Sequence, residues 1–164
     1  MNGPEWAVSG LIYSGYLIMK RYFTVGEANG LLGRVERHLR DALFAMNEYG
    51  EADEAFVAIQ KWILMAGGSV VDREKVTRIV AQRGAARVIW EQEMASLDGL
   101  GVQVKDLKMG LIDFPTWYRG EEVLLCWQFG EEEIRFWHGV SEGFRGRKEV
   151  DPEFLAGHSG ESEQ

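Results

Sequence analysis

The sequence predicts an α+β fold, in which a long antiparallel helical hairpin is followed by a small antiparallel β-meander of about four strands. Apolar residues recur at helical spacing from about residue 24 to residue 97, with one glycine-rich break between two helices. From residue 101 onward the apolar period shortens toward two, which is typical of strands. Because the helices precede the strands without alternation, a parallel doubly wound sheet is not expected.

Length and composition predict one domain, spanning residues 20–150. The chain has 164 residues, of which 46% are hydrophobic, enough for a sizeable core. A formal net charge of −8 disfavours binding to nucleic acid and to anionic membranes. The single cysteine excludes an internal disulfide and a four-cysteine zinc site, and it fits a cytoplasmic location.

Residues 1–19 are expected to form a weakly ordered N-terminal extension. Its apolar run, Ala7 to Met19, follows no basic segment and is shorter than the roughly 20 residues that span a bilayer. We therefore expect no membrane anchor. Two translation starts stay open, at Met1 and at Met19.

The first helix is predicted over about residues 24–65. Thr24 and Glu27 have the spacing of a capping box, which marks a helix start. A single glycine, Gly50, is expected to leave the helix unbroken. The apolar seam comprises Ala28, Leu32, Val35, Leu39, Ala42, Met46 and Tyr49.

A turn at residues 66–69 and an N-cap at Asp72 predict a second helix over about residues 72–97. Its apolar positions are Val76, Ile79, Val80, Ala86, Trp90, Met94 and Leu97. Two amphipathic helices with a short link form an antiparallel hairpin. Further apolar residues, such as Phe44 and Val57, widen the stripe beyond one seam. This surplus predicts a homodimer in which two hairpins form a four-helix arrangement.

Four strands are predicted within about residues 101–138, at 102–104, 111–114, 123–129 and 133–138. Residues 151–164 are polar and glycine-rich, with little to bury beyond Phe154 and Leu155. We therefore expect them to be a disordered tail.

Three segments resemble a known family: YFTVGEANGLLGRV at 22–35, LGVQVKDLKMGLIDFP at 100–115 and EEVLLCWQFGEEEIRFWHGVSEGFRGR at 121–147. They are similar to the bacterial family catalogued as domain of unknown function 2203, over about residues 20–150. The resemblance implies a helical region followed by a small β unit, and it brings no assigned activity, cofactor or catalytic residue. Members usually have proline where this chain has Gly33, which implies a bend in the first helix near that point.

The register of the last hairpin decides its chemistry. A two-residue loop at Gly130 and Glu131 would pair Cys126 with Arg135 and Val123 with His138. Cys126 and His138 would then lie on opposite sides of the sheet, unable to share a metal or to act as nucleophile and base. A three-residue loop would reverse this conclusion, because a slip of one residue exchanges the faces.

Under the first register, His138 is expected to be a buried histidine bonded to backbone, and Cys126 an inert strand residue. A metal site would instead use His138 and Glu142 with Asp106 or Asp113. No H-E-x-x-H pattern supports that alternative, so we predict no metal and no cofactor.

The ordinary role of Asp113 is an ion pair with Arg135 or Arg119. Arg145 and Arg147, in the sequence GFRGR, could hold a carboxylate or a phosphate, or could cover the sheet edge. No catalytic residue is assigned. The candidate binding residues are Asp106, Asp113, Arg135, Trp137, His138, Glu142, Arg145 and Arg147.

Two functions remain open. The first is a non-enzymatic homodimeric module that binds a protein or a small anionic ligand on its aromatic sheet. The alternative is an enzyme that uses His138 with nearby carboxylates and arginines in a pocket between sheet and helices. The basic residues of the second helix have acidic neighbours at helical spacing, so they predict a solvated face and no nucleic-acid site. A sealed His138 would favour the module.

Overall fold

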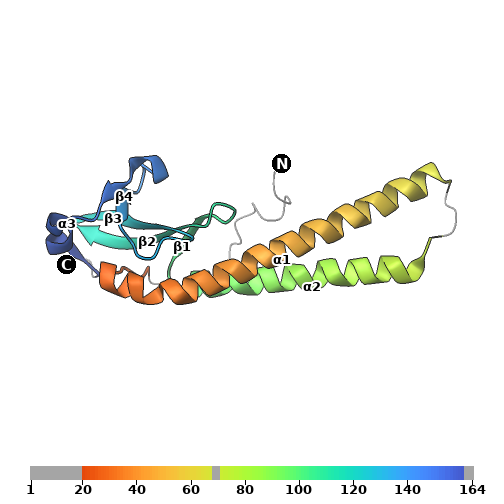
Figure 1. Ribbon diagram of the computed structural model, residues 1–164, viewed down its shortest axis with the longest axis horizontal. Helices are drawn as coiled ribbons and strands as arrows, with labels where there is room; N and C mark the ends of the chain where they lie inside the picture. The colour runs from red at the N-terminus through yellow and green to blue at the C-terminus, as the bar shows by residue number, and fades with distance from the viewer. Residues whose placement is uncertain (1–19, 68–70, 161–164) are drawn as a thin grey trace.

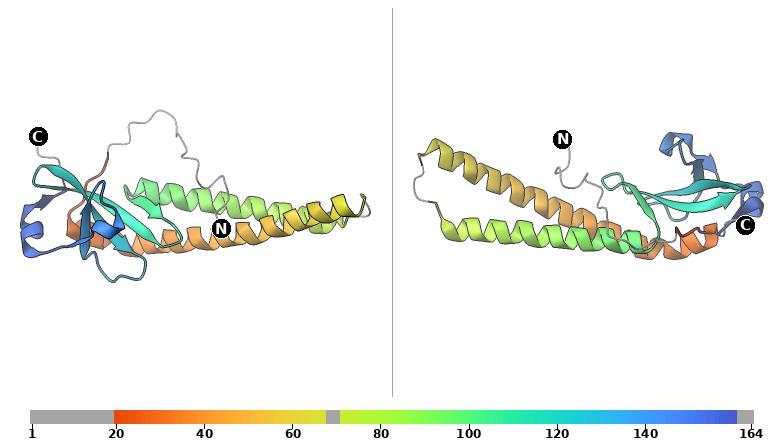
Figure 2. Two further views of the ribbon diagram at one scale, coloured as in Figure 1. Left: turned by 90° about the horizontal axis from the view of Figure 1, so that it is seen from above. Right: turned by 180° about the vertical axis from the view of Figure 1, so that it is seen from behind.

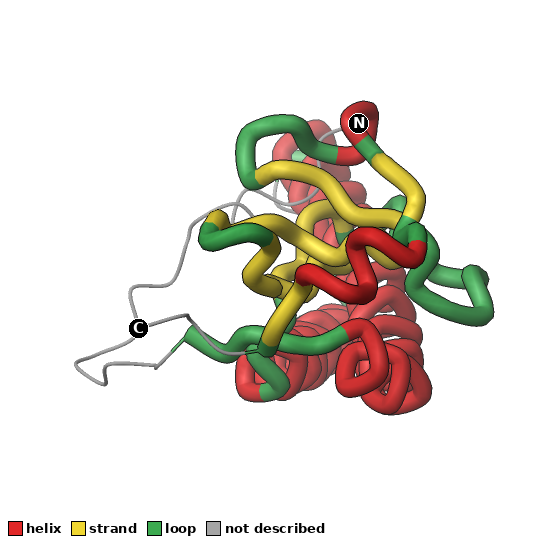
Figure 3. The backbone as a smooth tube through the Cα atoms, turned by 90° about the vertical axis from the view of Figure 1, so that its left-hand side faces the viewer, coloured by secondary structure: helices red, strands yellow, loops and turns green. Residues whose placement is uncertain are grey.

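The computed structural model describes residues 20–67 and 71–160, so the predicted extension 1–19 and residues 161–164 lie outside the described part. Helices α1 (Val25–Met65) and α2 (Arg73–Gly99) form a long hairpin, and a small sheet covers one end of it (Figure 1). Viewed along the hairpin, the sheet forms a second layer on one side of the helix pair (Figure 3). The predicted α+β fold is confirmed.

Helix α1 begins where the sequence predicts. The Thr24 side chain accepts from the Glu27 amide and the Glu27 side chain accepts from the Thr24 amide, a complete capping box. From there α1 continues through Gly33 and Gly50 as one helix of 41 residues. Nine side chains are buried along it: Val25, Ala28, Leu32, Val35, Leu39, Ala42, Ala45, Tyr49 and Ala52.

Helix α2 begins at an Asp72 cap and packs antiparallel to α1. Its buried side chains are Ala86, Trp90 and Leu97, all in the half near the sheet. Toward their connection the two helices diverge (Figures 1 and 2). Among the described residues, no helix combines the length and the apolarity needed to cross a bilayer.

The sheet is antiparallel, in the order β1-β2-β3-β4-β5, with β6 also paired to β2. The strands are β1 (Gln103–Asp106), β2 (Leu111–Tyr118), β3 (Glu121–Gln128), β4 (Phe136–Gly139), β5 (Lys148–Glu149) and β6 (His158–Ser159). The four predicted strands are therefore present as a meander, and two short strands extend it.

Strand β2 runs past the point where the sequence predicts it to end, just before Pro115. Strand β1 pairs with β2 only at residues 111–113, and β6 pairs with it only at residues 117–118. Pro115 lies in the gap between them, where its carbonyl accepts from the Phe23 amide at 2.8 Å. Because no strand needs a donor at that point, the missing N–H of proline leaves the ladder intact.

The inner face of the sheet and the first half of α1 share the main core. From the sheet it contains Ile112, Phe114, Val123, Leu125 and Trp127, and Ile134 joins it from the segment before β4. Since side chains alternate along a strand, the intervening residues of β2 and β3 face away from the helices. Several of these are also buried, including Asp113, Leu124 and Cys126.

The end of the chain differs from the disordered tail predicted from residue 151. Asp151 caps a short helix, α3 (Pro152–Gly157), and β6 follows it. Phe154 is fully buried and stacks on Trp137, with ring centroids 4.8 Å apart. One aromatic side chain thus anchors a segment whose composition is otherwise polar.

Candidate functional site

The register of strands β3 and β4 brings Cys126 and His138 to the same face of the sheet. Cys126 pairs with Phe136 and Leu124 pairs with His138, one residue away from the predicted register. On the other side of β3, Asp113 of β2 pairs with Cys126. The prediction that the thiol and the imidazole lie on opposite faces is therefore wrong.

The slip arises in residues 129–135. A tight turn is present, but it lies one residue earlier than expected: the Glu131 amide donates to the Gln128 carbonyl at 2.9 Å, so Phe129 and Gly130 are its central residues, and Gly130 has a φ of 98°. After that turn the chain leaves the sheet and bends toward α1. There Asn29 Oδ1 accepts from the Ile134 amide at 2.8 Å, and the Ile134 side chain enters the core. Pairing resumes only at Phe136, and the residues of β4 therefore point to the faces of the sheet opposite to those predicted.

Three chemically reactive side chains meet on this outer face. Asp113, Cys126 and His138 each offer one ligand atom, and the three atoms all lie within 4.8 Å of one another. Their side chains are almost fully buried, at 1%, 1% and 2% relative exposure. We refer to these three residues as the outer-face cluster.

Hydrogen bonding places a proton on Nδ1 of the His138 ring. Its Nδ1 lies 2.9 Å from the Gly139 carbonyl, which can only accept, so Nδ1 carries the proton. Nε2 then faces Oδ2 of Asp113 at 3.3 Å. Within the described residues, neither Asp113 oxygen has a hydrogen-bond partner of normal geometry, and the nearest ammonium, that of Lys105, is 3.9 Å away. The predicted ion pair of Asp113 with Arg135 or Arg119 is not formed.

Cys126 is held by an arginine. Arg147 donates through Nε to the sulfur at 3.3 Å, and its two other nitrogens donate to the Glu131 carboxylate at 2.9 and 3.2 Å. Burial raises the pKa of the Cys126 thiol to about 12, and the neighbouring Asp113 carboxylate raises it further, while Arg147 opposes the rise. The thiol is thus neutral at physiological pH and is a poor nucleophile.

The sequence GFRGR closes over this site. Arg147 lies between the rings of Phe136 and Phe144, with its guanidinium 4.8 and 4.4 Å from their centroids. Gly146 is required here, because an added Cβ would approach the Cβ of Glu142 to 2.5 Å. Arg147 is committed to Glu131 and Cys126, whereas Arg145 is exposed. The structure does not bring the two arginines together as an anion site.

The remaining candidate residues have local structural contacts. Asp106 accepts from the Met109 amide at 2.9 Å, within the turn before β2. Trp137 donates to the Glu149 carbonyl at 3.2 Å. Glu142 accepts from the Gly139 amide at 2.7 Å and pairs with Lys148, and these contacts hold the pKa of its carboxyl below the usual range. Neither Asp106 nor Glu142 belongs to the outer-face cluster.

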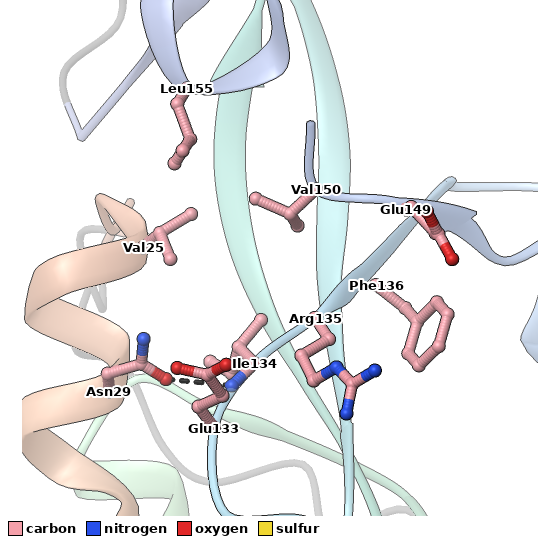
Figure 4. Close-up of a pocket in the computed structure, with 9 residues that line it drawn as sticks. All are labelled: Val25, Asn29, Glu133, Ile134, Arg135, Phe136, Glu149, Val150 and Leu155. Atoms are coloured by element: carbon pink, nitrogen blue, oxygen red, sulfur yellow. Dashed lines mark hydrogen bonds between the residues drawn. The ribbon is translucent and has the colours of Figure 1, made fainter. Parts of the chain in front are cut away.

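A shallow pocket lies at the sheet edge beside the start of α1 (Figure 4). Its volume is about 320 Å³, and it is lined by Val25, Asn29, Glu133, Ile134, Arg135, Phe136, Glu149, Val150 and Leu155. It contains Arg135, one of the candidate residues, together with two carboxylates. His138 does not line it, so the pocket does not supply the catalytic arrangement that the enzyme alternative requires.

Comparison with known proteins places the chain in a family. The family described as "Uncharacterized conserved protein (DUF2203)" matches residues 21–150, which is most of the chain. The chain belongs to the DUF2203 family. No curated protein and no solved structure was found to match it. The matched residues include α1, α2, strands β1 to β5 and the whole outer-face cluster of this DUF2203 protein.

The sequence of the DUF2203 chain pointed to Asp113 and His138 as candidate residues, whereas Cys126 was interpreted as inert because the assumed register put it on the face opposite His138. Glu131 was assigned only to the hairpin loop. One signal in the sequence indicated an irregular connection: Gly130 is followed by three consecutive glutamates, which suit a loop better than a strand.

Proposed function

We propose that this DUF2203 protein is a non-enzymatic homodimeric interaction module, and that two copies associate through the distal part of the helical hairpin. The distal part comprises residues 53–65 of α1 and 73–85 of α2. The observation that carries the proposal is that no side chain in these two segments is buried. They nevertheless contain many large apolar residues: Phe56, Val57, Ile59, Trp62, Ile63, Leu64, Met65, Val76, Ile79 and Val80.

The shape of the distal part supports a docking role. Where the helices diverge, they leave a groove of about 490 Å³ lined mainly by apolar side chains, including Ala55, Ile59, Trp62 and Val76. Trp62 is 50% exposed, and Met65 is 87% exposed. Apolar surface of this extent on two adjoining helices is typical of a protein interface.

Charge favours a second copy as the occupant. On α1, residues 51–54 include Glu51, Asp53 and Glu54, whereas the exposed charged residues in the first two turns of α2 are Arg73, Glu74, Lys75 and Arg78, which are basic on balance. A two-fold axis that pairs the hairpins antiparallel would set α2 of one copy against α1 of the other. Each copy would then offer its basic segment to the acidic segment of its partner, as an isologous interface requires.

The outer-face cluster supports a non-enzymatic module over the enzyme alternative. His138 is sealed at 2% exposure and its Nδ1 is bonded to backbone, so no substrate reaches it in this conformation. The pocket in Figure 4 pairs Arg135 with two glutamates, which disfavours a small anionic ligand there. A cytoplasmic location is part of the proposal, and the single buried cysteine supports it.

Analytical ultracentrifugation at micromolar concentration tests this proposal. We expect the purified chain to sediment as a particle of about twice 18.6 kDa. Trp62→Glu should give the mass of one chain, because a carboxylate would be buried in the interface. The control is Val140→Glu, which introduces the same carboxylate at an exposed apolar residue outside the hairpin. It should leave the dimer intact. A monomeric wild-type chain would contradict the proposal.

A further inference from the structure

We propose that Asp113, Cys126 and His138 are the protein ligands of a structural Zn²⁺ ion, bound through a carboxylate oxygen, Sγ and Nε2. The spacing supports it. Ligand atoms about 2.0–2.1 Å from a tetrahedral zinc ion are about 3.4 Å apart. The distance from His138 Nε2 to Asp113 Oδ2 is 3.3 Å, and Cys126 Sγ completes a set that lies within 4.8 Å.

A positive charge between His138 Nε2 and Asp113 Oδ2 would stabilise both atoms. With Nδ1 donating to Gly139, a neutral ring points the lone pair of Nε2 toward a carboxylate oxygen that also has only lone pairs to offer. Both Asp113 oxygens are buried without a hydrogen-bond partner of normal geometry among the described residues, and the Lys105 ammonium is 3.9 Å away. Burying an unsatisfied carboxylate is costly, and a bound cation removes that cost.

The surroundings of the cluster match those of a zinc site. A zinc-bound histidine usually donates its other ring nitrogen to a carbonyl or a carboxylate, as His138 Nδ1 does to Gly139. A zinc-bound thiolate is stabilised by an N–H donor, and Arg147 Nε donates to Cys126 Sγ. Because Glu131 pairs with Arg147, the arginine adds no net charge beside the cation.

The charges of the ligands select the metal. One carboxylate, one thiolate and one neutral imidazole together carry two negative charges, which a divalent ion neutralises. Sulfur and nitrogen ligands favour zinc over magnesium and calcium, which prefer oxygen. Binding removes the thiol proton of Cys126, which is released to solvent as the metal–sulfur bond forms.

The three ligands come from three consecutive strands, Asp113 from β2, Cys126 from β3 and His138 from β4. An ion among them would tie these strands together on the face that the helices do not cover. Three protein ligands leave the fourth tetrahedral position to a water molecule, and the near-complete burial of all three side chains denies substrate access, so the ion would act structurally. Zinc would then stabilise the sheet of the proposed module, independently of how its helices associate.

Cobalt titration of the full chain is a sharp test, because Cys126 is the only cysteine in the sequence. We would dialyse the protein against a chelator and add Co²⁺. The expected result is saturation at one ion per chain, visible bands of tetrahedral intensity and a near-ultraviolet band from thiolate-to-cobalt charge transfer. Zn²⁺ should then bleach all of these bands.

Variants assign the ligands. Cys126→Ser should abolish the charge-transfer band, and Asp113→Asn and His138→Gln should weaken binding by more than the 10–100-fold typical of outer-shell partners. His38→Gln is the matched control, since His38 pairs with Glu93 on the hairpin, and it should bind normally. Circular dichroism shows whether each variant is folded.

The wild-type titration decides the proposal even if a variant fails to fold. A folded wild-type chain without a thiolate-to-cobalt band would overturn it, as would a band that persists in Cys126→Ser. Neither outcome bears on the homodimer, which rests on the mass measured by sedimentation. The two proposals can therefore fail separately.

Discussion

The Nε2 atom of His138 lies 3.3 Å from Oδ2 of Asp113, although their strands are separated in the sheet by β3. Backbones two strands apart are about 9.5 Å from each other. The two side chains therefore lean over β3 and meet beside Cys126, which pairs with Asp113. A one-residue change of register between β3 and β4 would turn His138 to the opposite face.

The burial of Cys126 makes a prediction about its reactivity. In the native protein its thiol should not react with Ellman's reagent at mildly alkaline pH, because it is 1% exposed and burial raises its pKa to about 12. Below that value the thiol stays protonated and is unreactive. In denaturant, one thiol per chain should react at once. Rapid labelling of the native chain would show that the outer face is open.

Phe154 should anchor the end of the chain. Phe154→Ala is expected to lower the free energy of unfolding by about 3–5 kcal/mol, because it removes a buried ring stacked on Trp137. The adjacent Leu155 is 48% exposed, so Leu155→Ala should change it by no more than about 0.5 kcal/mol. Urea unfolding measures both. Equal small effects would indicate that α3 does not pack as described.

Two glycines with positive φ provide a matched test of the sheet. Gly110 has a φ of +65°, and a Cβ there would lie 2.4 Å from the Phe129 Cβ, whereas Gly120 has a φ of +78° and open space around it. Gly120→Ala should lower the unfolding free energy by about 1–2 kcal/mol, the usual cost of left-handed backbone. Gly110→Ala should lower it by about 1–3 kcal/mol more, because it adds a steric overlap. Similar losses in the two variants would argue against the close contact.

The capping box of α1 should make stability depend on acidic pH. Hydrogen bonds from the Thr24 amide, the larger effect, and from the Thr24 hydroxyl hold the pKa of Glu27 below its ordinary value of 4.5. A lowered folded pKa stabilises the protein above the unfolded pKa, and this contribution is lost as pH falls through the folded value. The difference in unfolding free energy between wild type and Glu27→Gln should therefore be largest at neutral pH and shrink below about pH 4.5. A difference that persisted in strong acid would contradict the assignment.

The helices were predictable because their signals are local. Each helix cap, at Thr24 with Glu27 and at Asp72, is formed by residues within one helical turn. The apolar seam follows from the spacing of residues along one helix. The structure confirms all three features. The hairpin register was not predictable in this way. It depends on Asn29, which lies 105 residues before Ile134 and draws the chain out of the sheet.

The candidate site was predictable only in part, for the same reason. Asp113 and His138 could be named as reactive residues, but whether they meet Cys126 depends on the register between β3 and β4, which sets the face on which His138 lies. The order of the C-terminal segment likewise depends on Phe154 packing against Trp137, a contact between residues 17 positions apart that composition alone does not reveal. Long-range packing decided both features.

Nitrogen NMR of the His138 ring tests the central claim most directly. If the outer-face cluster is a zinc site, long-range nitrogen–proton spectra of the zinc-loaded protein should show Nδ1 protonated and Nε2 unprotonated, with the Nε2 shift changing when zinc is removed. A ring that is protonated on both nitrogens and unaffected by zinc would instead identify a simple ion pair with Asp113, and the metal site would be refuted.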